Sequence, residues 1–96
     1  MHNGIVPNER IRDRYPSRMR EFREQALLTR LEFFHASKKL AEQDPDRFKV
    51  VTTETLRNLE GGFTKPRLST ARTIAAVLGV RAEVIFPGGF DTGARR

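Results

Sequence analysis

The sequence predicts an all-α protein, a compact bundle of about five helices. Apolar residues recur at three- and four-residue spacings along several segments, and no segment alternates apolar and polar residues as a strand does. With 96 residues, 38% of them hydrophobic and seven of them Phe, the chain can bury one modest core. We therefore expect a single domain over residues 17–87, preceded by a basic arm over 1–16 and followed by a flexible tail over 88–96.

The first two predicted helices follow each other closely. The first is expected to begin after Ser17 and to run to about Leu28. Its inner face is marked by Met19, Phe22, Ala26 and Leu27. The second begins at Thr29, because Thr29 and Glu32 have the spacing of a capping box, and ends before Pro45. Its inward positions are Phe33, Phe34, Ser37, Leu40 and Ala41.

The third predicted helix is short and has sharp ends. Thr52 or Thr53 can cap its N-terminus, and Gly61-Gly62 permits the positive φ that closes a C-terminus. Leu56 and Leu59, three residues apart, give it a narrow apolar edge. Two more helices are expected, over residues 68–78 with Gly79 as a stop and over residues 80–86 before Pro87.

The outward face of the third helix carries an unusual number of short polar groups. Its residues are Thr53, Glu54, Arg57 and Asn58, with Thr52 at the cap. Such side chains can match the donors and acceptors of base edges in the major groove of DNA. The alternative is an ordinary solvated helix face.

The charge balance favours a polyanionic partner. Eighteen Lys and Arg residues oppose twelve Asp and Glu residues, which gives a net charge of +6. That surplus suits nucleic acid or an anionic membrane surface. No apolar run is long enough to span a membrane, and the N-terminus lacks the apolar core of a signal peptide. Together with the absence of cysteine, this leads us to expect a cytoplasmic, nucleoid-associated protein without a membrane partner.

The N-terminal arm contains Arg10, Arg12 and Arg14 between residues that oppose regular structure. It is either a mobile basic terminus or an arm that contacts the phosphate backbone or enters a groove.

No enzyme is predicted. His2 and His35 are the only histidines and lack a zinc-ligand spacing, no serine lies in a nucleophile motif, and no glycine-rich phosphate loop is present. We expect no cofactor, no metal and no small-molecule ligand.

An ordered set of motifs fills much of the chain. The set comprises Phe22-Arg23-Glu24, Leu28-Thr29-Arg30-x-Glu32-Phe33, Val51-Thr52, Leu56-x-x-Leu59-Glu60-Gly61-Gly62, Lys65-Pro66-Arg67-Leu68, Ile74-Ala75-x-x-Leu78-Gly79-Val80 and Ile85-Phe86. In these residues, over about 17–86, the chain resembles the phage repressor and Cro-like (lambda-repressor-like, XRE-type) helix-turn-helix family. The stretch between Arg30 and Val51 is longer than its family counterpart, so an extended second helix, a widened turn, or both are expected.

The resemblance implies roles for individual residues. Helix 52–60 would lie in the major groove, with Thr52, Thr53, Glu54, Arg57 and Asn58 near bases. Thr29, Arg30, Lys65 and Arg67 match positions that contact phosphate or the minor groove. Arg23 and Glu60 match a structural ion pair.

These observations predict a sequence-specific double-stranded DNA-binding regulator of the repressor type, bound as a homodimer to a two-fold operator. The apolar end formed by Val84, Ile85 and Phe86 is the candidate dimer contact, and core closure is its alternative. Two other functions stay open. One is a protein-interaction module, antitoxin-like or a phage accessory factor, which the longer stretch and Glu54 favour. The other is a non-specific nucleoid-type DNA binder.

Overall fold

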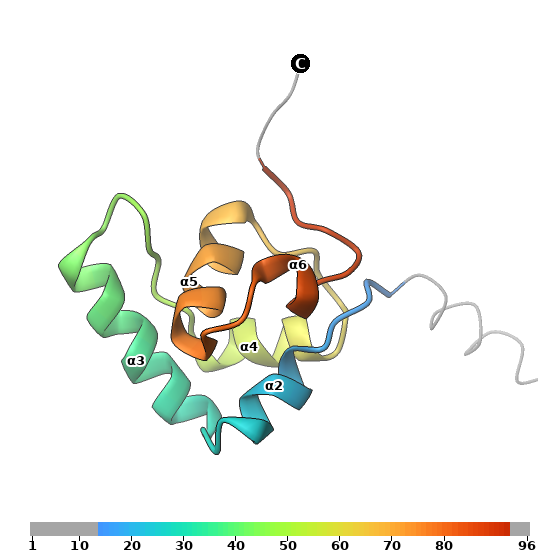
Figure 1. Ribbon diagram of the computed structural model, residues 1–96, viewed down its shortest axis with the longest axis horizontal. Coiled ribbons are helices and arrows are strands. Elements are labelled where there is room, and N and C mark those ends of the chain that lie inside the picture. Colours follow the sequence, from blue (N-terminus) through green and yellow to red (C-terminus); the bar gives the residue numbers. More distant parts are fainter. Residues whose placement is uncertain (1–13, 93–96) are drawn as a thin grey trace, which may run out of the picture.

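Five α-helices make up the part of the chain that the structure, a computed structural model, describes, residues 14–92 (Figure 1). They are α2 (Met19–Gln25), α3 (Arg30–Gln43), α4 (Thr53–Glu60), α5 (Leu68–Leu78) and α6 (Ala82–Ile85). Between residues 14 and 92 the β-type pairing consists of an isolated bridge between Arg67 and Asp91. The expected all-α fold class is confirmed.

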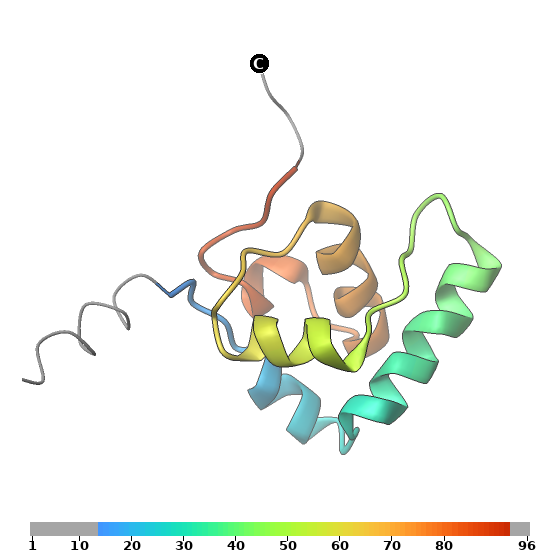
Figure 2. The ribbon, with the colours of Figure 1, turned by 180° about the vertical axis from the view of Figure 1, so that it is seen from behind.

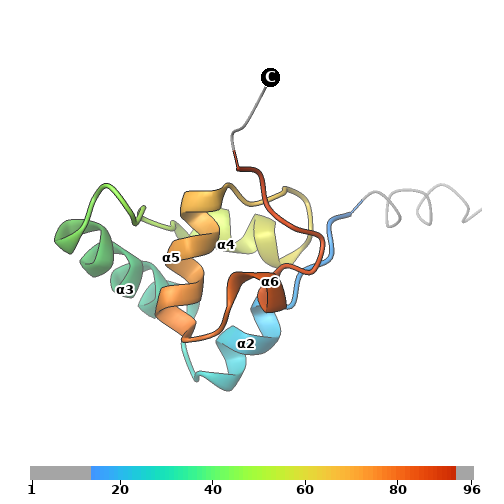
Figure 3. The ribbon, with the colours of Figure 1, turned by 45° about the horizontal axis from the view of Figure 1, so that its top comes forward.

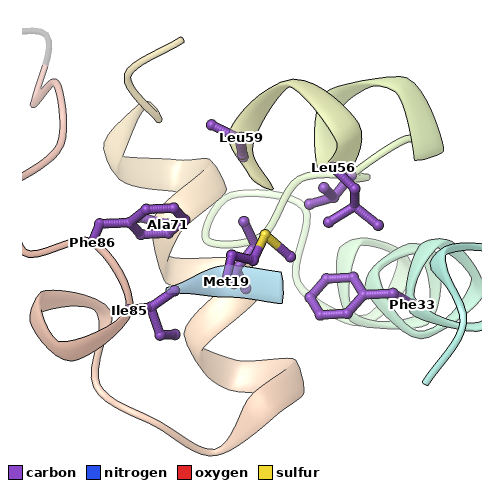
Figure 4. Close-up of a cluster of buried hydrophobic side chains, with 9 residues drawn as sticks. Met19, Phe33, Leu56, Leu59, Ala71, Ile85 and Phe86 are labelled. Atoms are coloured by element: carbon purple, nitrogen blue, oxygen red, sulfur yellow. The ribbon is translucent and has the colours of Figure 1, made fainter. Parts of the chain in front are cut away.

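A single core joins all five helices (Figure 4). Its buried members are Met19, Phe33, Val51, Leu56, Leu59, Ala71, Ile74, Ile85 and Phe86. Because every helix contributes at least one of them, no helix has its position fixed by local sequence alone. Burial of these apolar side chains is the main driving force for folding the bundle.

The helix starts at Thr29 and Thr52 agree with the sequence. Thr29 Oγ1 accepts a hydrogen bond from the Glu32 amide at 3.1 Å, and Glu32 Oε1 accepts one from the Thr29 amide at 2.9 Å. This is the predicted capping box. Thr52 caps α4 by accepting from the Thr55 amide at 3.1 Å. Gly79, with φ of 67°, ends α5 in the left-handed conformation.

Helix α2 is shorter than predicted. It ends at Gln25, and the chain then turns sharply, with Leu27 in the left-handed region at φ of 60°. Leu27 is 86% exposed and Ala26 is also exposed, so their predicted place on the inner face is wrong. The turn rotates the chain so that Leu28 packs against the core instead. The last helix is likewise reduced to the single turn Ala82–Ile85.

Both predicted causes of the long stretch between Arg30 and Val51 are present, an extended second helix and a wide turn after it. Helix α3 has 14 residues, and the segment 44–52 follows it before α4 begins. The connecting segment is bonded to α5, because the Lys49 amide donates to Thr73 Oγ1 at 2.9 Å. The chain then returns to α3, where the Val51 amide donates to Ser37 Oγ at 2.8 Å. Helix α4 therefore starts beside the middle of α3, and residues 38–50 form an excursion out and back (Figures 1 and 3).

Contacts of the fold extend past residues 17 and 87, the expected limits of the domain. The Tyr15 amide donates to the Gly62 carbonyl at 2.9 Å. At the other end, Phe90 packs against the core and the Asp91 amide donates to the Pro66 carbonyl at 2.7 Å. Both ends of the described chain thus attach to the loop between α4 and α5. No helix between residues 14 and 92 has the length and apolar character to cross a membrane.

Candidate nucleic-acid interface

Helix α4 is buried on one side and open on the other. Leu56 and Leu59 are buried against the core, and Figure 4 shows both side chains on the inner side of the helix. Figure 2 shows α4 on the face turned to the viewer, with α6 on the far side of the molecule. Thr53, Glu54, Arg57 and Asn58 lie off this buried edge and keep exposed or half-buried side chains that a partner could contact.

The predicted base-reading residues lie on this open side. Thr52, Glu54 and Arg57 are exposed, and Thr53 and Asn58 are half-buried. Thr52 differs from the others because its hydroxyl is already engaged. It accepts from the Thr55 amide and donates to the Thr55 hydroxyl at 3.0 Å. Its methyl group is the part left for an external contact.

The C-terminal end of α4 is held by a buried carboxylate. Glu60, whose side chain is 3% exposed, pairs with Arg23, which is 10% exposed. Arg23 Nε lies 2.5 Å from Glu60 Oε2, and Arg23 Nη1 donates to the Leu28 carbonyl at 2.8 Å. The structure confirms the predicted ion pair between α2 and the end of α4. Through this pair the buried Glu60 carboxylate holds the C-terminal end of α4 against α2.

Arg30 has a second role that the sequence did not indicate. Its Nη2 lies 3.0 Å from Glu60 Oε1, so Glu60 receives two guanidinium groups. Two positive charges against one carboxylate leave this cluster with a formal charge of +1. The Arg30 side chain is 35% exposed, which leaves part of it accessible to a phosphate group.

Further cations surround α4. Arg57, Lys65 and Arg67 are exposed on the helix and on the loop that follows it. Arg14 stacks on the Phe63 ring, with its guanidinium carbon 4.6 Å from the ring centroid. Arg10 and Arg12 of the predicted arm lie outside the described residues. Thr29 is exposed, but its hydroxyl caps α3 and is engaged with Glu32.

The predicted dimer contact does not form an exposed surface. Ile85 and Phe86 are buried in the core, and Val84 is half-buried. The alternative, core closure, accounts for Ile85 and Phe86. They close the core against Met19 and Ala71, so exposing them would unpack the bundle (Figure 4).

A small pocket lies where α3 meets the start of α4. It has a volume of about 180 Å³ and is lined by Leu31, Phe34, Thr52 and Thr53. Leu31 is 56% exposed although it is a large apolar side chain. This pocket was not predicted from the sequence. Its signal was the spacing of Leu31 and Phe34, which share a helix face distinct from that of the buried Phe33 and Ser37.

Residues 14–92 contain no group of three or more His, Asp or Glu side chains that could hold a metal ion. His35 lies against Phe34, with ring centroids 5.2 Å apart.

Comparison of the chain with protein-family models, curated proteins and solved structures found no match. The resemblance to the phage repressor family stays a prediction.

Proposed function

We propose that this protein binds double-stranded DNA in a sequence-specific manner and acts as a transcriptional repressor, with α4 in the major groove. The observation that carries the proposal is the two-sided character of α4. Leu56 and Leu59 fix it to the core, while Arg57, Thr53 and Asn58 stand on its accessible side. A helix that reads bases requires this combination of a rigid position and an accessible polar face.

The chemistry of the face suits base edges. The Arg57 guanidinium can donate two parallel hydrogen bonds to guanine, and the Asn58 amide can both donate to and accept from adenine. Glu54 can accept from the amino group of cytosine, and it disfavours close approach to phosphate. A face of this kind selects sequences instead of binding every duplex equally.

The flanking cations support the same docking. Lys65 and Arg67 are exposed on the loop that follows α4, and Arg30 retains an accessible part beside the start of α3. Contacts from such residues to phosphate fix the register of a reading helix without carrying sequence information. They also make binding fall steeply with salt, because each neutralised phosphate releases counterions.

A helix of eight residues covers only a few base pairs, so one copy gives modest specificity. We therefore propose that two copies bind half-sites about one helical turn apart. Such binding would block access of other proteins to the same stretch of DNA, which is the basis for proposing repression.

The burial of Ser37 and Val51 removes one argument for a protein-interaction module. That alternative drew support from the long connection between the second and third helices. The hydrogen bond from Val51 to Ser37 places the start of α4 next to the middle of α3, so the two helices stay in contact despite the excursion.

The test begins with selection of bound duplexes from a random pool, followed by mobility-shift titration at two salt concentrations. Arg57→Ala and Asn58→Ala are expected to relax base preference at specific positions, each by about 1–3 kcal/mol of discrimination. The matched control is Arg81→Ala, which removes the same charge from an exposed residue before α6. It should leave the base preference unchanged.

Three outcomes count against the proposal. Unchanged preference in the Arg57 and Asn58 variants would reject α4 as the reading helix. Retardation without any preferred sequence would indicate a nucleoid-type binder. Absence of retardation at low salt would favour the protein-interaction module.

A further inference from the structure

The pocket beside the start of α4 is apolar although it opens on a strongly polar surface. Leu31 and Phe34 of α3 form one wall, and Thr52 and Thr53 form the other. Exposed leucines scattered on a surface need no explanation, but Leu31 forms part of a concave site next to the proposed reading helix. The N-terminal residues of a reading helix are those that contact base edges most closely.

The polar atoms of the pocket are largely withdrawn. The Thr52 hydroxyl is hydrogen-bonded to Thr55 through both its oxygen lone pair and its proton. The methyl is the part of the Thr52 side chain without a hydrogen bond, and the other wall of the pocket consists of the apolar residues Leu31 and Phe34. Apart from the Thr53 hydroxyl, this site has no free side-chain donor with which to select a hydrogen-bonding group. It can select an apolar one by excluding water from it.

The charges around the pocket are complementary to a nucleic-acid duplex. Lys38 is exposed one turn along α3 from Phe34, and Arg57 is exposed one turn along α4 from Thr53. Arg30 precedes Leu31 and belongs to a cluster with a formal charge of +1. These three cations face two exposed carboxylates, Glu54 on α4 and Glu32 next to Leu31 on α3, so the balance around the pocket is positive by one charge. An apolar pocket within a cationic surface fits an apolar group carried on a polyanion.

We propose that this pocket receives the 5-methyl group of a thymine in the major groove, and that Leu31 is a specificity-determining residue. The thymine methyl is the apolar group that DNA presents in the major groove, and side chains such as threonine methyls and phenylalanine contact it. The inference rests on the proposed function, because it requires α4 to enter the groove. It adds a contact from α3, the preceding helix, to the base readout.

The test uses the preferred duplex found by selection and replaces each thymine in turn by deoxyuridine, which lacks only the methyl group. At one thymine in each half-site the replacement is expected to weaken binding roughly three- to fivefold, the effect of leaving one methyl-sized group in water. Leu31→Ala, which opens the pocket, is expected to bind the thymine and deoxyuridine duplexes with similar affinity.

Leu27→Ala is the matched control. Leu27 is also an exposed leucine, four residues earlier, but it does not line the pocket. This variant should keep the full preference for thymine. Circular dichroism and urea unfolding of both variants verify that they remain folded, which their exposure favours.

The outcomes separate this inference from the proposed function. Sequence-specific binding that tolerates deoxyuridine at every position would overturn the inference and leave the function standing. Retention of the thymine preference in Leu31→Ala would show that the methyl is read elsewhere. Failure of the protein to bind any duplex at low salt would overturn both.

Discussion

The Val51 amide donates a hydrogen bond to Ser37 Oγ at 2.8 Å, joining the start of α4 to the middle of α3. Ser37 also donates to the Phe34 carbonyl at 2.8 Å, and both Ser37 and Val51 are buried. The bond restores a close approach of the two helices after the excursion of residues 38–50. This buried hydroxyl therefore holds the start of the proposed reading helix against α3, in addition to the core contacts of Leu56 and Leu59.

Replacing that hydroxyl is expected to be costly. Ser37→Ala leaves the buried Val51 amide without an acceptor, which should lower the free energy of unfolding by about 1–3 kcal/mol. Urea unfolding measures this loss, and hydrogen exchange should show reduced protection of the Val51 amide. Thr64→Ala, at an exposed position, is the control and should change little. Equal stability of the two variants would contradict the role of Ser37.

Removing the charge of Glu60 is expected to destabilise the fold more strongly. Glu60→Gln leaves the buried Arg23 and the half-buried Arg30 without their carboxylate, and breaking a buried pair in this way costs roughly 3–5 kcal/mol. Thermal or urea unfolding tests the prediction. Glu24→Gln is the control, because its pair with Arg20 is exposed and contributes little. A small effect at Glu60 would mean that its pairs add no more than those on the surface.

Loss of the Arg30 side chain should affect all duplexes alike. Arg30→Ala removes a proposed phosphate contact but leaves Glu60 paired with Arg23. We expect weaker binding to every sequence, a salt dependence reduced by about one unit in the log–log slope, and an unchanged base preference. Mobility-shift titrations over a range of salt concentrations measure all three. An altered sequence preference would show instead that Arg30 sets the orientation of α4.

The exposed pair on α2 gives a prediction for pH. Hydrogen bonds from Arg18, one of them 2.9 Å long, lower the pKa of Glu21 below its ordinary value. Because the folded-state pKa is the lower one, the stabilisation by this carboxylate is complete above the ordinary pKa. It is lost as the pH falls through the lowered pKa.

Carboxyl NMR titration can follow Glu21 directly. In Arg18→Ala the Glu21 pKa is expected to rise toward its ordinary value. High salt should reduce the difference in Glu21 pKa between this variant and the unsubstituted protein. An identical Glu21 titration in both proteins at low salt would rule out Arg18 as the cause.

Much of the fold could be predicted because its signals are local. The capping box of Thr29 and Glu32 and the cap at Thr52 are encoded within one helix turn. The glycine stop of α5 at Gly79 is local in the same way. The outward face of α4 followed from the spacing of Leu56 and Leu59, which are indeed buried. The pair between Arg23 and Glu60 is not local, and it was predicted only through the family resemblance.

The remaining features depend on contacts between distant segments. Leu27 adopts a left-handed conformation, which is uncommon for leucine and cannot be predicted from its side chain. The early end of α2 was therefore not predicted. An apolar residue such as Ile85 has the same sequence signature in a core as on a docking surface, and only the packing of α6 decides between them. The second bond of Glu60, to Arg30, likewise requires α3 and α4 to be placed in space.

The loop that carries Lys65 and Arg67 is hydrogen-bonded to both ends of the described chain. Tyr15 bonds to Gly62 on one side, and Asp91 exchanges backbone hydrogen bonds with Pro66 and Leu68 on the other. A fragment trimmed to the five helices would keep the buried core but lose the hydrogen bonds that Tyr15 and Asp91 make to this loop. The loop would then be less firmly held. Minimal versions for crystallisation or for grafting onto another protein should therefore begin no later than Arg14 and end no earlier than Thr92.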